Sequence, residues 1–93
     1  MLYISYDFTD NKVRAQFSRF LQKYGRRIQY SLFLIKNSER VLQNILTEIE
    51  LNYKNKFTGA DSIIIVPITA ADQSKIVRYG YAANEESDVL IFS

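Results

Sequence analysis

The chain has 93 residues, of which 47% are hydrophobic and 14% aromatic, and its basic and acidic residues leave a net charge of only +2. This length and composition predict one small folded domain and exclude a disordered chain. The sequence contains no cysteine and no histidine, which excludes disulfides, thiolate zinc sites, cysteine nucleophiles and histidine-based acid–base catalysis. Any phosphodiester chemistry would therefore need carboxylates and a hard divalent cation.

No membrane segment or leader is visible in the sequence. No apolar run approaches the roughly 20 residues that a helix needs to cross a bilayer. The N-terminus also lacks the basic region and the long apolar stretch of a signal peptide. We therefore expect a cytoplasmic protein without a membrane partner.

The first predicted element is a strand over residues 2–7. Every second residue in it, Leu2, Ile4 and Tyr6, is apolar, and this period of two is typical of a half-buried strand. Asp7 stands at its C-terminal end, where open α/β domains tend to place functional groups. On position alone, a carboxylate that caps a turn or a helix is the simpler interpretation of Asp7.

A helix is predicted next, with Asp10 as its N-cap. Apolar residues recur along it with helical spacing, at Val13, Phe17, Phe20, Leu21 and Tyr24. We expect Gly25 to end this helix as a C-cap in the left-handed conformation.

Basic residues concentrate in this part of the chain. The segment from residue 11 to residue 38 contains seven of the 12 basic residues and no acidic one. At about 100° per residue, Lys12, Arg19 and Lys23 align on the helix face opposite the apolar stripe, with Arg14 on a flank. A merely solvated face usually mixes charge signs to form i,i+4 pairs. We therefore interpret the segment as a phosphate-binding surface. The expected nucleic-acid-binding residues are Lys12, Arg14, Arg19, Lys23, Arg26 and Arg27.

The middle of the chain predicts further strands and a second helix. Residues 26–35 are rich in β-formers and predict either one long strand or two short strands with a bend near residues 30–31. Ser38 is the expected N-cap of a helix that reaches Tyr53. A loop is expected over residues 52–59.

Three apolar segments follow in the last third of the chain. Residues 62–66 form a continuous run of mostly β-branched residues, which predicts a central strand buried on both faces. Residues 75–79 predict another strand, and residues 82–87 an acidic loop. Residues 88–92 predict a last strand, whose unpaired edge we expect a second copy of the chain to cover.

The order of these elements predicts the fold class. A single α+β domain over residues 1–93 is expected, with the ferredoxin-like βαββαβ order and an extra C-terminal strand. Two helices would cover one face of an antiparallel sheet and leave the other face open. Another subunit or a nucleic acid normally covers such a face.

Several blocks of the sequence resemble a known family. The blocks YDFTDNKVR (residues 6–14) and KYGRRIQYSLF (residues 23–33), followed by IVPIT (65–69) and IVRYGY (76–81), look like the CRISPR-associated protein Cas-two (Cas2). Cas2 is the smaller of the two universal spacer-acquisition proteins. Residues 34–37 depart from the family, because they lack the small and acidic residues that often follow the phenylalanine.

The resemblance implies an assembly. Members of this family form ferredoxin-like homodimers with strand exchange, which would place residues 82–93 against the sheet of the partner subunit. They assemble with the Cas-one integrase, and double-stranded DNA lies across the dimer. Arg14, Arg27, Ser31 and Phe33 fall on recurring positions of the family.

The resemblance also implies a catalytic site. Some family members are described as Mg²⁺-dependent nucleases that act on RNA or DNA. Asp7 matches the strand-end acid of the family and Tyr6 matches its neighbour, which makes Asp7 and Tyr6 the candidate catalytic residues. One aspartate is a poor metal site, but two Asp7 related by the dimer axis could share one Mg²⁺ or Mn²⁺. Because a general base is missing, hydrolysis would be slow or need alkaline pH. No other cofactor is expected.

Three functions are compatible with these features. The first is a scaffold for spacer acquisition, which binds duplex DNA and bridges integrase subunits. The second is a metal-dependent endoribonuclease or DNase that acts on its own, like a toxin. The third is a small-ligand regulatory domain, which gives the one-sided basic charge no role. We favour the scaffold and leave hydrolysis open.

Overall fold

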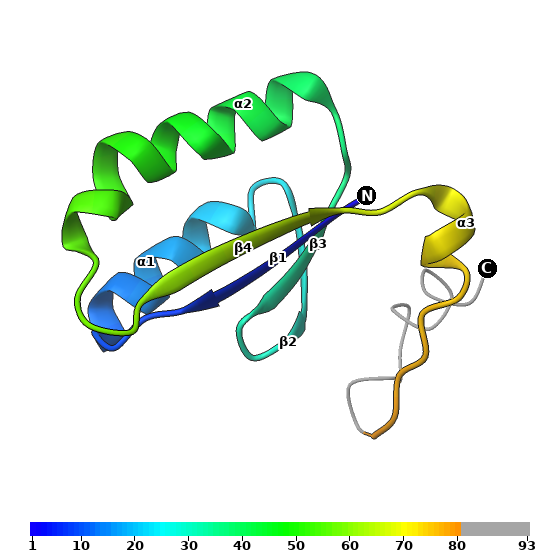
Figure 1. The fold of residues 1–93 in the computed structure, drawn as a ribbon, viewed down its shortest axis with the longest axis horizontal. Coiled ribbons are helices and arrows are strands. Elements are labelled where there is room, and N and C mark those ends of the chain that lie inside the picture. The colour runs from blue at the N-terminus through cyan, green and yellow to red at the C-terminus, as the bar shows by residue number, and fades with distance from the viewer. Residues whose placement is uncertain (81–93) are drawn as a thin grey trace.

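A computed structural model describes residues 1–80 of the chain (Figure 1). The predicted loop 82–87, the predicted strand 88–92 and the pairing of residues 82–93 lie outside this part. The elements, in chain order, are β1 (Leu2–Asp7), α1 (Asn11–Leu21), β2 (Gly25–Gln29), β3 (Leu32–Ile35), α2 (Glu39–Glu48), a π-helical turn (Ile49–Tyr53), a 3₁₀ turn (Lys54–Lys56), β4 (Ser62–Pro67) and α3 (Ala70–Gln73).

The strands form one sheet in the order β2-β3-β1-β4, in which all neighbours are antiparallel. Figure 1 shows α1 and α2 on the same side of this sheet. The predicted α+β class and the βαββαβ order are thus confirmed. None of the helices within residues 1–80 is long and apolar enough to cross a membrane.

Aromatic rings fill the space between the sheet and the two helices. Leu2, Ile4 and Tyr6 of β1 are buried against the helices, so the predicted alternation is confirmed. Phe17 of α1 lies at the centre, with ring centroids 5.1 Å from Tyr6 and 4.9 Å from Tyr53. Such edge-to-face pairs stabilise a core beyond the area that they bury.

The start of α1 is as predicted, but its end is not. The Asp10 carboxylate accepts hydrogen bonds from the backbone N–H groups of Lys12 (2.7 Å) and Val13 (3.2 Å). The prediction that Gly25 caps the helix is wrong, because α1 ends at Leu21 and Gly25 begins β2 without a positive φ. A Cβ on Gly25 would lie 2.3 Å from the carbonyl oxygen of Leu34. The glycine is therefore needed for the close approach of β2 to β3.

The segment 26–35 forms two strands joined at Tyr30 and Ser31, the second of the two predicted alternatives. The second helix begins as expected, with the Ser38 hydroxyl accepting from the N–H of Val41. The loop predicted over residues 52–59 is wrong in its first half, since π-helical and 3₁₀ turns extend the helix to Lys56.

The prediction of a central strand over residues 62–66 is wrong. Within residues 1–80, β4 pairs only with β1 and forms an edge of the sheet. Ile63 and Ile65 pack towards the helices, whereas Ile64 and Val66 are 57% and 45% exposed. A run of β-branched residues is also compatible with an edge strand that is buried on one face only, so the pattern does not distinguish an edge strand from a central one.

The prediction of a strand over residues 75–79 is also wrong, since no ladder forms there. Instead, Ile76 packs against Ile28 and Leu34 on the face of the sheet away from α1 and α2. Arg78 donates a hydrogen bond to the carbonyl oxygen of Ile28 (3.0 Å). The segment is therefore held across the sheet by side-chain contacts.

Candidate nucleic-acid interface

Three of the predicted basic residues lie on α1 or just after it. Lys12 and Arg19 are on the helix, but the prediction that the helix includes Lys23 is wrong, because Lys23 lies in the turn that follows Leu21. Lys12, Arg19 and Lys23 are exposed, whereas Phe17 and Leu21 turn the opposite side of the helix into the core. Eleven residues of helix rise about 16 Å, on the order of five base pairs of duplex. We call these three residues the outer basic face.

Arg14 and Arg27 lie elsewhere, between α1 and the β2–β3 hairpin. The Arg14 guanidinium donates to Asn11 Oδ1 (2.7 Å), to the Tyr30 hydroxyl (3.1 Å) and to the carbonyl oxygen of Phe8 (3.2 Å). Arg27 donates to Ser18 Oγ, and its guanidinium carbon lies 5.7 Å from the centre of the Phe33 ring. The structure thus separates these two arginines from the outer basic face. Arg26 is half-buried in β2, opposite Leu34.

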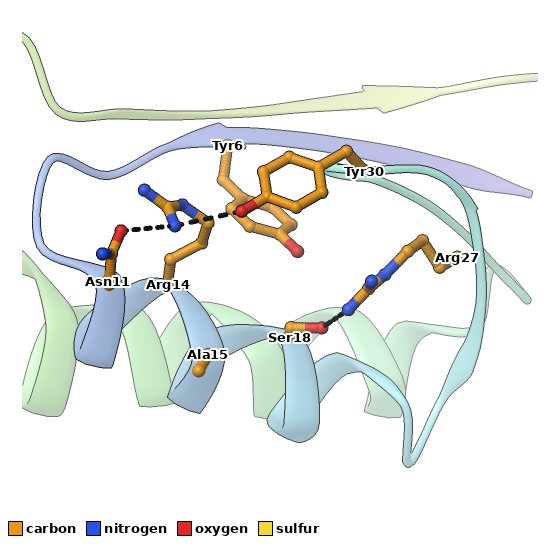
Figure 2. A pocket seen from close by; sticks show the side chains of 7 residues that line it. All are labelled: Tyr6, Asn11, Arg14, Ala15, Ser18, Arg27 and Tyr30. Carbon is orange, nitrogen blue, oxygen red and sulfur yellow. Dashed lines mark hydrogen bonds between the residues drawn. The ribbon is translucent and has the colours of Figure 1, made fainter.

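A pocket of about 150 Å³ lies between these two arginines (Figure 2). Tyr6 and Ser18 are buried at its inner end, and Asn11, Arg27 and Tyr30 are exposed at its mouth. We call it the two-arginine pocket.

A second, wider groove of about 410 Å³ lies between α1 and the end of the second helical segment. Arg19 and Lys23 of the outer basic face line one wall, and Tyr53 and Glu48 contribute to the rest. Burial raises the pKa of the Tyr53 phenol, the Glu48 charge raises it further, and Arg19 partly opposes both. The sequence does not indicate this groove, because the helical spacing of Tyr53 predicts only a position in the core.

Asp7 and Tyr6 point to opposite faces of the sheet. Tyr6 is 2% exposed and packs in the aromatic core, whereas Asp7 is exposed on the other face, opposite Ser62 in the β1–β4 register. Within residues 1–80 the Asp7 carboxylate makes no hydrogen bond or ion pair. Asp10, not Asp7, caps α1. The carboxylate of Asp7 is therefore available for another role.

A metal ion does not fit Asp7 within one chain. Residues 1–80 contain no group of three or more acidic side chains that could hold a metal ion. One carboxylate leaves most of the coordination shell of Mg²⁺ to water. The shared ion expected from the resemblance would need Asp7 from a second copy.

The structure adds one residue near the C-terminal end of β1 that the sequence did not indicate. Asp61 accepts hydrogen bonds from the N–H and the hydroxyl of Thr9 (both 2.8 Å) and from the N–H of Thr58 (3.1 Å). These bonds tie the turn after β1 to the chain before β4. The hydrogen bond from the Thr9 backbone is the main reason why the pKa of Asp61 is lowered. The contact between Thr9 and Asp61 could not be predicted from local sequence patterns, because 52 positions separate the two residues.

We expect Asp61→Asn to destabilise the protein at neutral pH but not in acid. The lowered pKa in the folded state means that the Asp61 carboxylate contributes stability above its unfolded value of about 3.9. That contribution is lost as the pH falls through the lower folded value. Denaturant unfolding of the wild type and of Asp61→Asn should show a difference in unfolding free energy at pH 7 that narrows as the pH falls below the unfolded value of about 3.9. An equal difference in unfolding free energy at pH 7 and in acid would contradict this role of the Asp61 carboxylate.

Comparison with known proteins identifies relatives of the chain. The family model described as CRISPR associated protein Cas2 matches residues 1–76. The crystal structure of a hypothetical protein, TT1823, from Thermus thermophilus superposes with a TM-score of 0.64 at 27% sequence identity, covering 74% of this chain and 82% of that one. No curated protein matches the chain in sequence.

Proposed function

The chain belongs to the family of CRISPR associated protein Cas2, and from this membership we propose that it serves spacer acquisition as a scaffold that binds duplex DNA. In this role a homodimer bridges subunits of the Cas-one integrase, with the duplex lying across it. The observation that carries the DNA-binding part is the outer basic face, where Lys12 and Arg19 are exposed on a helix that contains no acidic residue and Lys23 is exposed in the turn after it.

The chemistry of this face suits phosphates better than base edges. Lysine and arginine side chains that contact phosphates position a duplex without reading its sequence. Each such contact releases condensed counterions, so the affinity falls as salt rises. The proposed scaffold therefore binds duplexes of unrelated sequence alike.

The open edge of the sheet supports the homodimer. An edge strand presents unpaired backbone groups that recruit another strand, and β4 is such an edge within residues 1–80. Ile64 and Val66 also expose apolar surface on the face away from the helices. A second copy, with residues 82–93 exchanged between subunits, would cover both features.

A metal-dependent nuclease is the second candidate function. The observation that favours it is the exposed Asp7 carboxylate, which has no structural partner within residues 1–80. In the proposed homodimer, two Asp7 would hold one Mg²⁺ or Mn²⁺, which would supply a Lewis acid for phosphodiester cleavage of RNA or DNA. Tyr6 lies across the sheet from Asp7 and would act at most indirectly.

The two functions differ in what Asp7→Ala does. For the scaffold, the variant should bind a short duplex within about twofold of the wild type, because Asp7 lies outside the outer basic face. Binding would be measured by fluorescence anisotropy, and cleavage by incubating labelled RNA and duplex with Mg²⁺. The matched control is Asp72→Ala, which removes an exposed carboxylate from α3.

Cleavage decides between the candidates. Wild-type cleavage that Asp72→Ala retains and Asp7→Ala loses would establish the nuclease. Weakened duplex binding in Asp7→Ala alone would contradict the scaffold as we describe it.

A further inference from the structure

The two-arginine pocket contains a buried hydroxyl without a partner. Tyr6 is 2% exposed, and its hydroxyl has no hydrogen-bond partner within the described residues. Figure 2 shows this hydroxyl directed into the space between the Tyr30 ring and the Ser18–Arg27 hydrogen bond. Buried polar groups in folded proteins are nearly always paired with protein, water or a ligand. The Tyr6 hydroxyl is therefore the group that a ligand in this pocket would satisfy.

The charge around this hydroxyl is positive. Two guanidinium groups, those of Arg14 and Arg27, line the pocket with it. No carboxylate within residues 1–80 forms an ion pair with either arginine. Two cations that share a partly closed pocket without a counter-charge favour an anion between them.

The two arginines differ in how many hydrogen bonds their guanidinium groups already make. Three hydrogen bonds to Asn11, Tyr30 and Phe8 fix the Arg14 guanidinium in place, so it contributes a fixed charge at one wall. Arg27 directs one N–H at Ser18 within the described residues, out of the five that a guanidinium carries. Arg27 therefore retains donors for a ligand.

The volume of the pocket and the directions of its hydrogen-bond donors indicate which anion fits it. The pocket measures about 150 Å³, well below the roughly 300–1,000 Å³ of sites that enclose drug-sized ligands. Its donors come from opposite walls and from the inner end (Figure 2). The tetrahedral oxygens of a phosphate can meet such donors at once, whereas a carboxylate offers oxygens in only one plane.

We propose that the two-arginine pocket binds a single phosphate group, which accepts hydrogen bonds from the Tyr6 hydroxyl and from Arg27 and is neutralised by both arginines. The same chemistry is offered by inorganic phosphate and by the terminal phosphate of a nucleic-acid strand. This site is distinct from the outer basic face, so it goes beyond the proposed binding of a duplex along α1.

Calorimetric titration with sodium phosphate at constant ionic strength tests the pocket. The wild type should bind phosphate and should bind acetate much more weakly. Tyr6→Phe keeps the ring in the core and removes the hydroxyl, and it should weaken phosphate binding roughly tenfold or more, as expected for a lost hydrogen bond to a charged group. Arg27→Gln should weaken it at least as much.

Two control variants exclude general effects. Arg40→Gln removes an equal charge from an exposed position on α2, outside the pocket and outside the outer basic face, and Tyr24→Phe removes a tyrosine hydroxyl from the edge of the core. Both should bind phosphate like the wild type. The inference is overturned if the wild type binds acetate as well as phosphate, or if Tyr6→Phe binds phosphate unchanged. An equal loss in Arg40→Gln would also overturn it.

A competition experiment separates the two sources of phosphate. A tetranucleotide with a 5′-phosphate should displace inorganic phosphate if strand ends are the ligand, whereas the same strand with a 5′-hydroxyl should not. If neither strand competes, free phosphate is the ligand. A wild type that binds an unphosphorylated duplex but not phosphate would overturn this inference alone. One that binds phosphate but not the duplex would overturn the proposed function alone.

Discussion

The combined substitutions Lys12→Gln, Arg19→Gln and Lys23→Gln are expected to weaken binding to duplex DNA by at least about tenfold at moderate salt. These side chains form the outer basic face and are exposed, so neutralising them removes phosphate contacts without opening the core. Each lost contact should also reduce the slope of log affinity against log salt by about 0.9, or up to about 2.7 for three.

Fluorescence anisotropy over a series of salt concentrations measures both quantities. The matched control is Arg40→Gln, Lys54→Gln and Lys75→Gln, which removes the same charge from exposed positions outside α1. This control should keep most of the affinity and of the slope. Equal losses in the two triple variants would show that net charge, and not the outer basic face, determines binding.

The substitution Phe17→Ala is expected to lower the free energy of unfolding by about 3–5 kcal/mol. Phe17 is fully buried and contacts the rings of Tyr6, Phe8 and Tyr53. Its removal would leave a cavity where sheet and helices meet. For a small domain with a total stability of roughly 5–15 kcal/mol, this loss leaves a substantial unfolded fraction.

Denaturant unfolding followed by circular dichroism measures this effect. Tyr79→Ala is the control, because Tyr79 is 89% exposed and its removal should change the unfolding free energy by less than about 0.5 kcal/mol. A loss of less than about 1 kcal/mol in Phe17→Ala would contradict the central place of this ring in the core.

Features that depend on neighbouring residues could be predicted from the sequence. The alternation in β1 follows from side-chain direction along a strand. The caps at Asp10 and Ser38 follow from the preference of short polar side chains for unpaired helical N–H groups. The order of strands and helices then limited the fold to the ferredoxin-like type.

Features that depend on distant residues could not be predicted in this way. The edge position of β4 depends on which strands pair, and a β-branched run is compatible with either place. The position of Gly25 after an apolar stripe predicts a helix cap, but the residue is needed because a side chain there would clash with the backbone of Leu34. The segment 75–79 has the composition of a strand, yet Ile76 and Arg78 hold it across the sheet.

The candidate site shows the same division. The exposure of Lys12 and Arg19 on one face of α1 follows from helical periodicity, whereas Lys23 lies in the turn after the helix. Periodicity cannot show that Arg14 and Arg27 line the same pocket, because Arg14 lies on a helix and Arg27 on a strand. The unpaired Tyr6 hydroxyl between them could be recognised only once the packing of α1 against the sheet was known.

Binding of duplex DNA through its phosphates can be tested by a titration of the unmodified protein. The wild-type protein would be titrated against two duplexes of equal length and unrelated sequence, at several salt concentrations. We predict equal dissociation constants for the two duplexes, and a log affinity that falls linearly and steeply with log salt. No binding, a salt-independent affinity, or a tenfold or greater preference for one sequence would contradict this mode of binding.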